Sequence, residues 1–214
     1  MGGMGGMSMG AAPWGDAGDV TYPLFLVNGK PPTDPDVLTA RPGQRVRLRV
    51  INAASDTIFS VALGGHAMTI THTDGHAVQP TEVSAFYIGM GERYDAIVTL
   101  ADGIFPLVAR PFGKTSGGQG LALVRTGSGT APGPNANPSE LSGQILIGSQ
   151  LQPAASSLLP GKSPDATVDL ALQGSMKPYQ WGINGAPFGK NEPLAVTAGQ
   201  RLRINATNMT MMTH

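Results

Sequence analysis

The sequence repeats itself at a fixed offset of 156 residues, and this repeat limits the possible folds more than any other feature. Segment 27–58 contains V-N-G-K-P followed by P-G-Q-R-V-R-L-R-V-I-N, and segment 183–214 contains I-N-G-A-P followed by A-G-Q-R-L-R-I-N-A-T-N. A period of this length is one domain and is too long for a solenoid repeat. The 214 residues therefore predict one whole domain and the beginning of a second, similar one. The identical pairs are Asn28 and Asn184, Gly29 and Gly185, Pro31 and Pro187, Leu38 and Leu194, Gly43 and Gly199, Gln44 and Gln200, Arg45 and Arg201, Arg47 and Arg203, Asn52 and Asn208, and Thr57 and Thr213.

Short strands separated by turns predict an all-β fold. Residues 45–50 alternate arginine with Val46, Leu48 and Val50, which is the period of a half-buried strand with its apolar side chains toward a core. Residues 67–72 have the same period, and the Asp74-Gly75 pair after them predicts a hairpin turn. The 30 glycines and 18 prolines disfavour a helical bundle, while 41% hydrophobic residues suffice for a core. We therefore expect a β-sandwich or barrel, with further strands near 83–88, 94–100, 121–125, 144–147 and 166–172.

Composition divides the chain into four parts. Residues 1–18 are rich in Met and Gly and predict a flexible linker, because dense glycine is costly to order. Residues 19–150 carry the strand pattern of a complete domain. Residues 151–165 predict a second linker, and residues 166–214 predict the truncated start of a second domain.

Charge and hydropathy exclude several classes of protein. Fourteen basic and fourteen acidic side chains give a net charge of zero, so we expect no nucleic-acid partner. No apolar run approaches the length of a transmembrane helix, so we expect no membrane span, and residues 1–10 lack the pattern of a signal peptide. The chain has no cysteine, which excludes disulfides and any thiolate metal site built from this chain alone.

Several motifs together resemble a known family. Residues 28–32, 41–53, 66–69, 73–75 and 89–95 resemble the second cupredoxin domain of bacterial multicopper oxidases, including laccase-like and copper-resistance oxidases. Residues 181–185 and 210–214 resemble the opening of the third domain of the same family.

This resemblance implies cupredoxin-like Greek-key β domains, the first of them, residues 19–150, copper-free. It also implies one-electron oxidation of phenols or metal ions at a type 1 copper, coupled to reduction of dioxygen to water at a trinuclear copper cluster. The implied location is periplasmic or secreted. The implied partners are the missing cupredoxin domains of the same protein and a small phenol or metal-ion substrate.

The sequence departs from the family in its copper ligands. The family's first domain supplies His-x-His pairs and its third domain a His-Pro-x-His-x-His run and a His-Cys-His run, none of which occurs here. By position, His214 resembles the first histidine of the His-Pro-x-His-x-His run, which the family uses on the type 1 copper. We therefore interpret the chain as a truncated oxidase that needs copper at full length. Alone, it is expected to bind no copper stably and to lack oxidase activity.

Other candidate metal ligands come from the residues themselves. His66, His72 and His76 surround the Asp74-Gly75 hairpin, and His72 and His76 could approach each other across it. Two imidazoles without a third ligand make a weak site, so we interpret all three as structural residues. The thioethers of Met4, Met7 and Met9 suit Cu(I), but a low-complexity linker fixes no geometry for them. The alternative function is thus a non-enzymatic copper-handling or scaffold β-sandwich that uses this arm.

The polar residues near the strands suggest structural roles. Asp95 has no second carboxylate or histidine at a telling spacing, which predicts a charge pair or turn contact. Arginines 45, 47 and 49 point outward and predict a solvated face or a domain interface. Tyr94 is a candidate corner tyrosine that ties its strand to the backbone.

Overall fold

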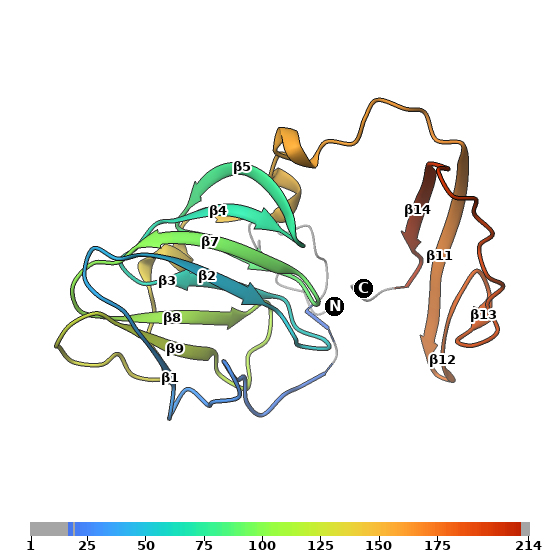
Figure 1. The fold of residues 1–214 in the computed structure, drawn as a ribbon. Helices are drawn as coiled ribbons and strands as arrows, with labels where there is room; N and C mark the ends of the chain where they lie inside the picture. The colour runs from blue at the N-terminus through green and yellow to red at the C-terminus, as the bar shows by residue number, and fades with distance from the viewer. Residues whose placement is uncertain (1–16, 19, 211–214) are drawn as a thin grey trace, which may run out of the picture. The chain divides into compact units, whose positions relative to one another are not determined.

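A computed structural model describes residues 17–18 and 20–210 of the chain. Contacts between Cα atoms divide it into two compact units, one formed by Asp19–Leu158 and one that includes the residues from Leu159 onward. Figure 1 shows both units as β structures joined by an extended segment. The only helical segments among the described residues are three short 3-10 turns, at Ser139–Ser142, Gly148–Gln150 and Ala155–Ser157.

Two sheets make up the unit of residues 19–158. A six-stranded sheet has the order β1-β9-β8-β3-β6-β10, and a four-stranded sheet has the order β2-β7-β4-β5. The six-stranded sheet consists of β1 Asp36–Thr39, β3 Phe59–Leu63, β6 Ala85–Ile88, β8 Ile104–Pro111, β9 Gly120–Arg125 and β10 Ile145–Leu146. The four-stranded sheet consists of β2 Arg45–Ile51, β4 Met68–Thr73, β5 His76–Val83 and β7 Arg93–Thr99.

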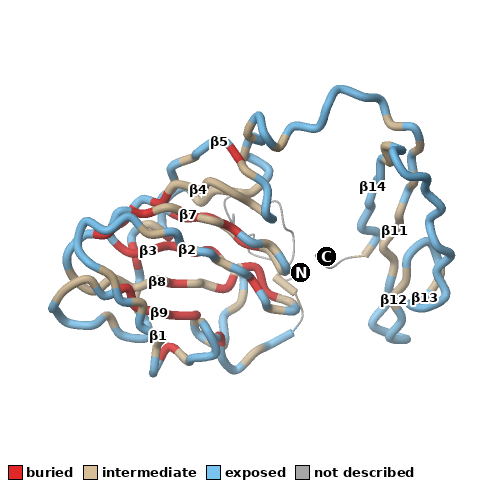
Figure 2. Tube along the Cα trace, in the orientation of Figure 1, coloured by how far each residue is buried: buried red, intermediate tan, exposed pale blue. Residues whose placement is uncertain are grey.

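The core of this unit lies between its two sheets. Leu63, Phe86 and Val124 from the six-stranded sheet form one buried cluster with Met68 and Tyr94 from the four-stranded sheet. The other face of the six-stranded sheet is covered as well, since Val108 and Leu121 pack with Leu141 of the first 3-10 turn. The outer face of the four-stranded sheet has no such cover in the described chain and carries polar side chains (Figure 2).

The alternation in residues 45–50 is confirmed. Strand β2 alternates exposed arginines with half-buried Val46, Leu48 and Val50, which pack against the buried cluster. The Asp74-Gly75 hairpin is confirmed too: both residues have positive φ, 50° and 84°, and the turn joins β4 to β5. Glycine and aspartate tolerate this left-handed conformation, which matches the twist of a tight hairpin.

The all-β fold is confirmed as a sandwich of open sheets, because each sheet ends in two edge strands and closes no barrel. The strands expected near residues 67–72, 94–100, 121–125, 144–147 and 166–172 correspond to β4, β7, β9, β10 and β11. The segment expected at 83–88 is instead the end of β5 followed by β6. Strands β1, β3 and β8 were not expected.

The second unit contains one four-stranded sheet with the order β13-β12-β11-β14. Its strands are β11 Ala166–Met176, β12 Tyr179–Ile183, β13 Ala186–Pro187 and β14 Leu202–Asn208. Strands β11 and β14 pair in parallel, with Val168 opposite Ile204. Because side chains alternate along a strand, one face of the sheet is apolar and the other polar. The apolar face carries Val168, Leu170, Leu172, Trp181, Ile183, Leu202 and Ile204.

The sequence repeat is also a repeat of local structure. The turn at Asn28-Gly29 has φ values of 51° and 78°, and the turn at Asn184-Gly185 has 51° and 80°. The Gln44 side chain accepts a hydrogen bond from the amide three residues earlier at 3.0 Å, and the Gln200 side chain accepts the equivalent bond at 3.0 Å. Strand β14 occupies the place of β2 in the repeat.

Candidate functional site

His66 is a structural residue in the turn between β3 and β4. It is 7% exposed, and its ring packs edge-on against Phe105. Its Nδ1 donates to the Gly64 carbonyl at 2.8 Å, and its Nε2 accepts from the Ala101 amide at 3.0 Å. A carbonyl only accepts and an amide N–H only donates, so both ring nitrogens are committed to the backbone. No lone pair of this imidazole remains for a metal.

The register of the β4–β5 hairpin separates His72 from His76. His72 lies opposite Ala77, and Thr73 lies opposite His76. Side chains of successive residues leave a strand on opposite faces, so the two imidazoles point to opposite sides of the sheet. The hairpin therefore does not bring this candidate pair together.

The remaining candidate ligands, Met4, Met7, Met9 and His214, lie outside the described residues. Within residues 17–18 and 20–210, no group of three or more His, Cys, Asp or Glu side chains is arranged to hold a metal ion. The donor set of the described chain thus does not fit a copper centre, which needs several imidazoles and, at a type 1 site, a thiolate.

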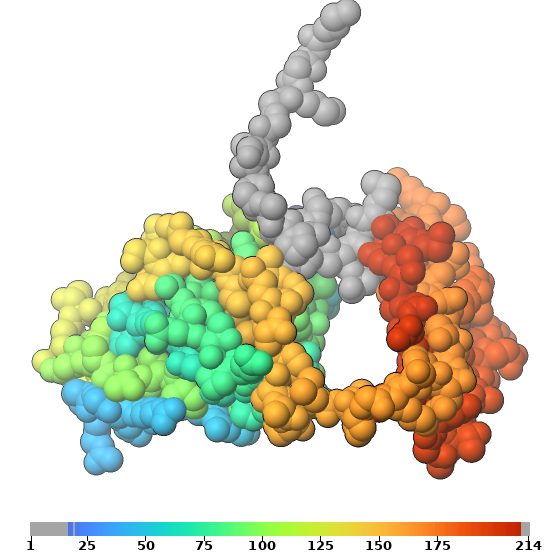
Figure 3. Space-filling view, turned by 90° about the horizontal axis from the view of Figure 1, so that it is seen from above, coloured from blue at the N-terminus to red at the C-terminus, as the bar shows by residue number. Residues whose placement is uncertain are grey.

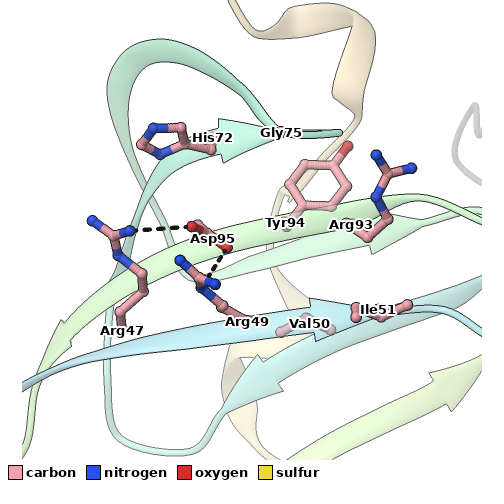
Figure 4. A pocket seen from close by; sticks show the side chains of 9 residues that line it. All are labelled: Arg47, Arg49, Val50, Ile51, His72, Gly75, Arg93, Tyr94 and Asp95. Atoms are coloured by element: carbon pink, nitrogen blue, oxygen red, sulfur yellow. Dashed lines mark hydrogen bonds and ion pairs between the residues drawn. The ribbon is translucent and has the colours of Figure 1, made fainter.

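A hollow of about 430 Å³ lies on the outer face of the four-stranded sheet. Figure 4 shows its lining, in which Arg47 and Arg49 of β2 reach toward Asp95 of β7. The distances are 3.4 Å from Arg47 Nη1 and 3.7 Å from Arg49 Nε to the two oxygens of the carboxylate. The expected charge pair at Asp95 is therefore confirmed. Because one carboxylate faces two guanidinium groups, this part of the hollow keeps an excess of positive charge.

His72 borders the hollow through a short chain of hydrogen bonds. The Thr71 hydroxyl donates to the Asp95 carbonyl at 3.3 Å, and His72 Nδ1 lies 3.1 Å from the same hydroxyl oxygen. Since the hydroxyl hydrogen is already used, Nδ1 is the donor in this pair. The hollow is therefore lined by side chains suited to holding an anionic group rather than a cation. Sequence reasoning missed it, because Thr71 and His72 meet Asp95 only through sheet register.

Tyr94 is a buried residue, but it does not make the expected corner contact. Its side chain is 1% exposed and packs against Phe86, with ring centroids 5.0 Å apart. Its hydroxyl is buried with no hydrogen-bond partner among the described residues, so it does not tie the strand to the backbone. Burial, with the nearby Glu92 carboxylate, raises the pKa of Tyr94 to about 12. The phenol therefore stays protonated and serves as a packing group.

Comparison with known proteins identifies the family. Residues 11–129 match the sequence model of the multicopper oxidases. The chain is 46% identical over 200 residues to multicopper oxidase MmcO of Mycobacterium tuberculosis, covering 94% of this chain and 39% of that protein. The chain belongs to the multicopper oxidase family. It is also 24% identical to a copper resistance protein A homolog of Pseudomonas syringae, covering 97% of this chain and 50% of that protein.

Solved structures confirm the cupredoxin-like fold of this multicopper oxidase chain. A multi-copper oxidase from Pseudomonas thermotolerans matches with a TM-score of 0.52 and 21% identity, over 87% of this chain and 42% of that one. Fet3p, a multicopper oxidase that functions in iron import, matches with a TM-score of 0.54 and 18% identity, over 64% of this chain and 28% of that one. The chain spans about two fifths to one half of the length of the first two curated relatives. In the described part of the chain, no helix has the length and apolarity needed to cross a membrane.

Proposed function

We propose that the protein acts as part of a laccase-like multicopper oxidase that couples one-electron oxidation of phenols or metal ions to reduction of dioxygen to water. The observation that carries this proposal is the 46% identity to a multicopper oxidase over nearly the whole chain. The family match over residues 11–129 supports it independently. Copper is the cofactor that the family implies.

The 214 residues, in this proposal, supply a copper-free domain and not the catalytic copper sites. The chain has no cysteine and four histidines, so it has no thiolate for a type 1 copper. Both nitrogens of His66 bind the backbone, and His72 and His76 point apart. We accordingly assign the copper sites to other parts of the longer oxidase and expect the 214-residue chain alone to lack oxidase activity.

Residues 166–214 form, in this proposal, the start of the next cupredoxin-like domain. The apolar face of the β11–β14 sheet supports this assignment, because Ile204 is 52% exposed whereas its equivalent Leu48 packs into a core. A hollow of about 420 Å³ on this sheet includes Leu172, Trp181 and Phe188, and Phe188 is 99% exposed. An apolar sheet face is stable only when another layer covers it.

The candidate ligands and the location remain part of the same proposal. His214 is assigned to the type 1 copper of the longer protein, and Met4, Met7 and Met9 are secondary candidates for Cu(I). The assigned location is periplasmic or secreted, and the assigned partners are the other cupredoxin domains.

Copper content and oxidase activity test the proposal. The 214-residue chain and a longer oxidase that contains it are each loaded with copper, dialysed and assayed with a phenol and with Cu(I). The longer oxidase is expected to be blue and active, and the shorter chain colourless and inactive. A blue copper centre at one copper per 214-residue chain would overturn the assignment of copper sites, and an inactive longer protein would overturn the oxidase assignment.

A further inference from the structure

The two edges of the four-stranded sheet in residues 19–158 differ. At one edge, residues 152–157 run along β5, where the Gln79 amide donates to the Gln152 carbonyl at 2.8 Å and the Ala154 amide to the Ala77 carbonyl at 3.0 Å (Figure 3). At the other edge lies β2, and within the described residues no strand pairs with its outer side. A full-length edge strand with unpaired backbone groups is a template for another strand.

The backbone of β2 shows which groups face the open edge. The Leu100 amide donates to the Gln44 carbonyl at 3.0 Å, and the Asn52 amide donates to the Glu92 carbonyl at 3.1 Å. In an antiparallel pair, the residues that bond to the partner alternate along the strand. The even-numbered residues of β2 therefore bond toward β7. The odd-numbered residues Arg45, Arg47, Arg49 and Ile51 direct their amides and carbonyls toward the open edge.

The repeat supplies a filled version of the same edge. Strand β14 is the equivalent of β2, and β11 pairs with it in parallel over seven residue pairs. The Ala166 amide lies 3.4 Å from the Arg201 carbonyl, and the Met209 amide donates to the Leu172 carbonyl at 2.9 Å. The bonds to β11 thus come from odd-numbered residues, which are the equivalents of the odd-numbered residues of β2. The edge that is open in β2 is the edge that β11 fills in β14.

The register of this filled edge also gives the chemistry of the occupant. Opposite Ile204 and Ala206, β11 places the apolar Val168 and Leu170. Opposite Asn205, the equivalent of Arg49, it places Asp169, whose carboxylate accepts from the Asn205 side chain at 2.7 Å. On β2, the side chains of Arg47 and Arg49 are 45% and 71% exposed and share the single carboxylate of Asp95. A strand with an acidic outer face complements this edge.

We propose that the open edge of β2 binds an extended strand in parallel register. Alternate side chains of this strand are apolar and extend the core, and at least one on its outer face is acidic and faces Arg47 and Arg49. We assign the strand to a part of the same oxidase polypeptide outside these 214 residues, which rests on the family membership and on the 39% coverage of the mycobacterial relative. The competing explanation is that the arginines only guard an edge against aggregation.

Residue-specific hydrogen exchange tests the proposal, measured on the 214-residue chain and on a longer oxidase that contains it. We expect the amides of Arg47 and Arg49 to exchange at least about 100-fold more slowly in the longer oxidase, and the amide of Leu48 to be slow in both. Fast exchange of Arg47 and Arg49 in both proteins would overturn the proposal. Protection in the short chain would overturn the assigned occupant: if it rises with concentration, a second copy binds the edge, and if it does not, the strand lies within this chain.

A matched pair of proline variants gives a second measurement. Arg47→Pro removes an amide that faces the open edge, whereas Leu48→Pro removes one that bonds to β7. Arg47→Pro is expected to lower the urea midpoint of the longer oxidase much more than that of the 214-residue chain, and Leu48→Pro to destabilise both. An equal effect of Arg47→Pro in the two proteins refutes strand binding at this edge. Neither experiment reads oxidase activity, so their failure leaves the proposed function standing.

Discussion

Asn52, at the end of β2, allows a stability prediction with a control built into the chain. Its side chain is 5% exposed and makes three hydrogen bonds. The amide nitrogen donates to the Thr57 carbonyl at 2.8 Å and to the Ile88 carbonyl at 3.0 Å, and the oxygen accepts from the Ala54 amide at 2.9 Å. Asn52 therefore joins β2 to the loop before β3 and to the end of β6.

The change Asn52→Ala leaves these three backbone groups without their partner. Thr57 and Ile88 are buried, so water cannot easily replace the lost bonds at their carbonyls. At about 1–2 kcal/mol for each buried group, with less for the partly exposed amide of Ala54, the expected loss is about 3–4 kcal/mol. The repeat supplies the control. Asn208 makes the equivalent bond to the Thr210 amide at 2.9 Å but is exposed, so Asn208→Ala should cost less than about 1 kcal/mol.

Urea unfolding followed by amide NMR signals is the assay, because signals from β7 and β11 report the two units separately. Asn52→Ala is expected to lower the unfolding free energy read from β7 and leave that read from β11 unchanged. A loss below about 1 kcal/mol at β7, or an equal loss from Asn208→Ala, would show that the buried amide bonds do not hold the unit together.

Four further outcomes can be measured. Lys114→Met should cost about 3 kcal/mol in urea unfolding, because Lys114 Nζ lies 3.0 Å from Asp56 in a largely buried pair; the double variant with Asp56→Asn should recover part of the loss, and no recovery would contradict the pairing. Gly75→Ala should cost about 1–2 kcal/mol, because φ is 84°, whereas Gly143→Ala at φ −94° should cost little; equal costs would argue against backbone strain. The pKa of Asp165 is lowered by the Lys162 ammonium and the Arg201 amide, so the stabilising contacts are present above the ordinary pKa and lost as pH falls through the lowered one; the Arg201 amide signal should shift in acid, and Asp165→Asn should remove that shift. The pKa of Tyr94 is raised to about 12, so its contribution to stability is lost as pH rises from the ordinary value near 10 through 12; ultraviolet titration should show a late phenol that Tyr94→Phe removes.

Local patterns of sequence were sufficient for the edge of the fold. The period of β2 and the turn at Asp74-Gly75 are set by neighbouring residues, since alternation and positive φ are local requirements. The repeat extended this reasoning to β14 and to the turn at Asn184-Gly185.

The central strands could not be predicted, because long-range packing decides them. Strand β8 contains Pro106 and Pro111, and proline usually argues against a central strand. It nevertheless lies between β3 and β9, and the Pro106 carbonyl accepts from the Gly64 amide at 2.9 Å. Burial on both faces of the sheet outweighs the missing donor, and no local pattern reports that.

The candidate site depended on register as well. The spacing of His72 and His76 allowed a pair, and only the two-residue turn at Asp74-Gly75 separates their side chains. The Arg47–Asp95 contact joins residues 48 positions apart, so the sequence could predict a charge pair at Asp95 but not its partner.

The parallel pairing of β1 with β9 has a consequence for synthesis on the ribosome. Asp36 pairs with Ala122, so 86 residues separate the partners. At about 5–20 residues per second, β1 leaves the ribosome roughly 4–17 s before its partner is made. During that interval Val37 and Leu38 have no strand to pair with, and the six-stranded sheet can complete only once β9 has emerged. Nascent chains are therefore most open to aggregation and to chaperone binding before residue 125 appears.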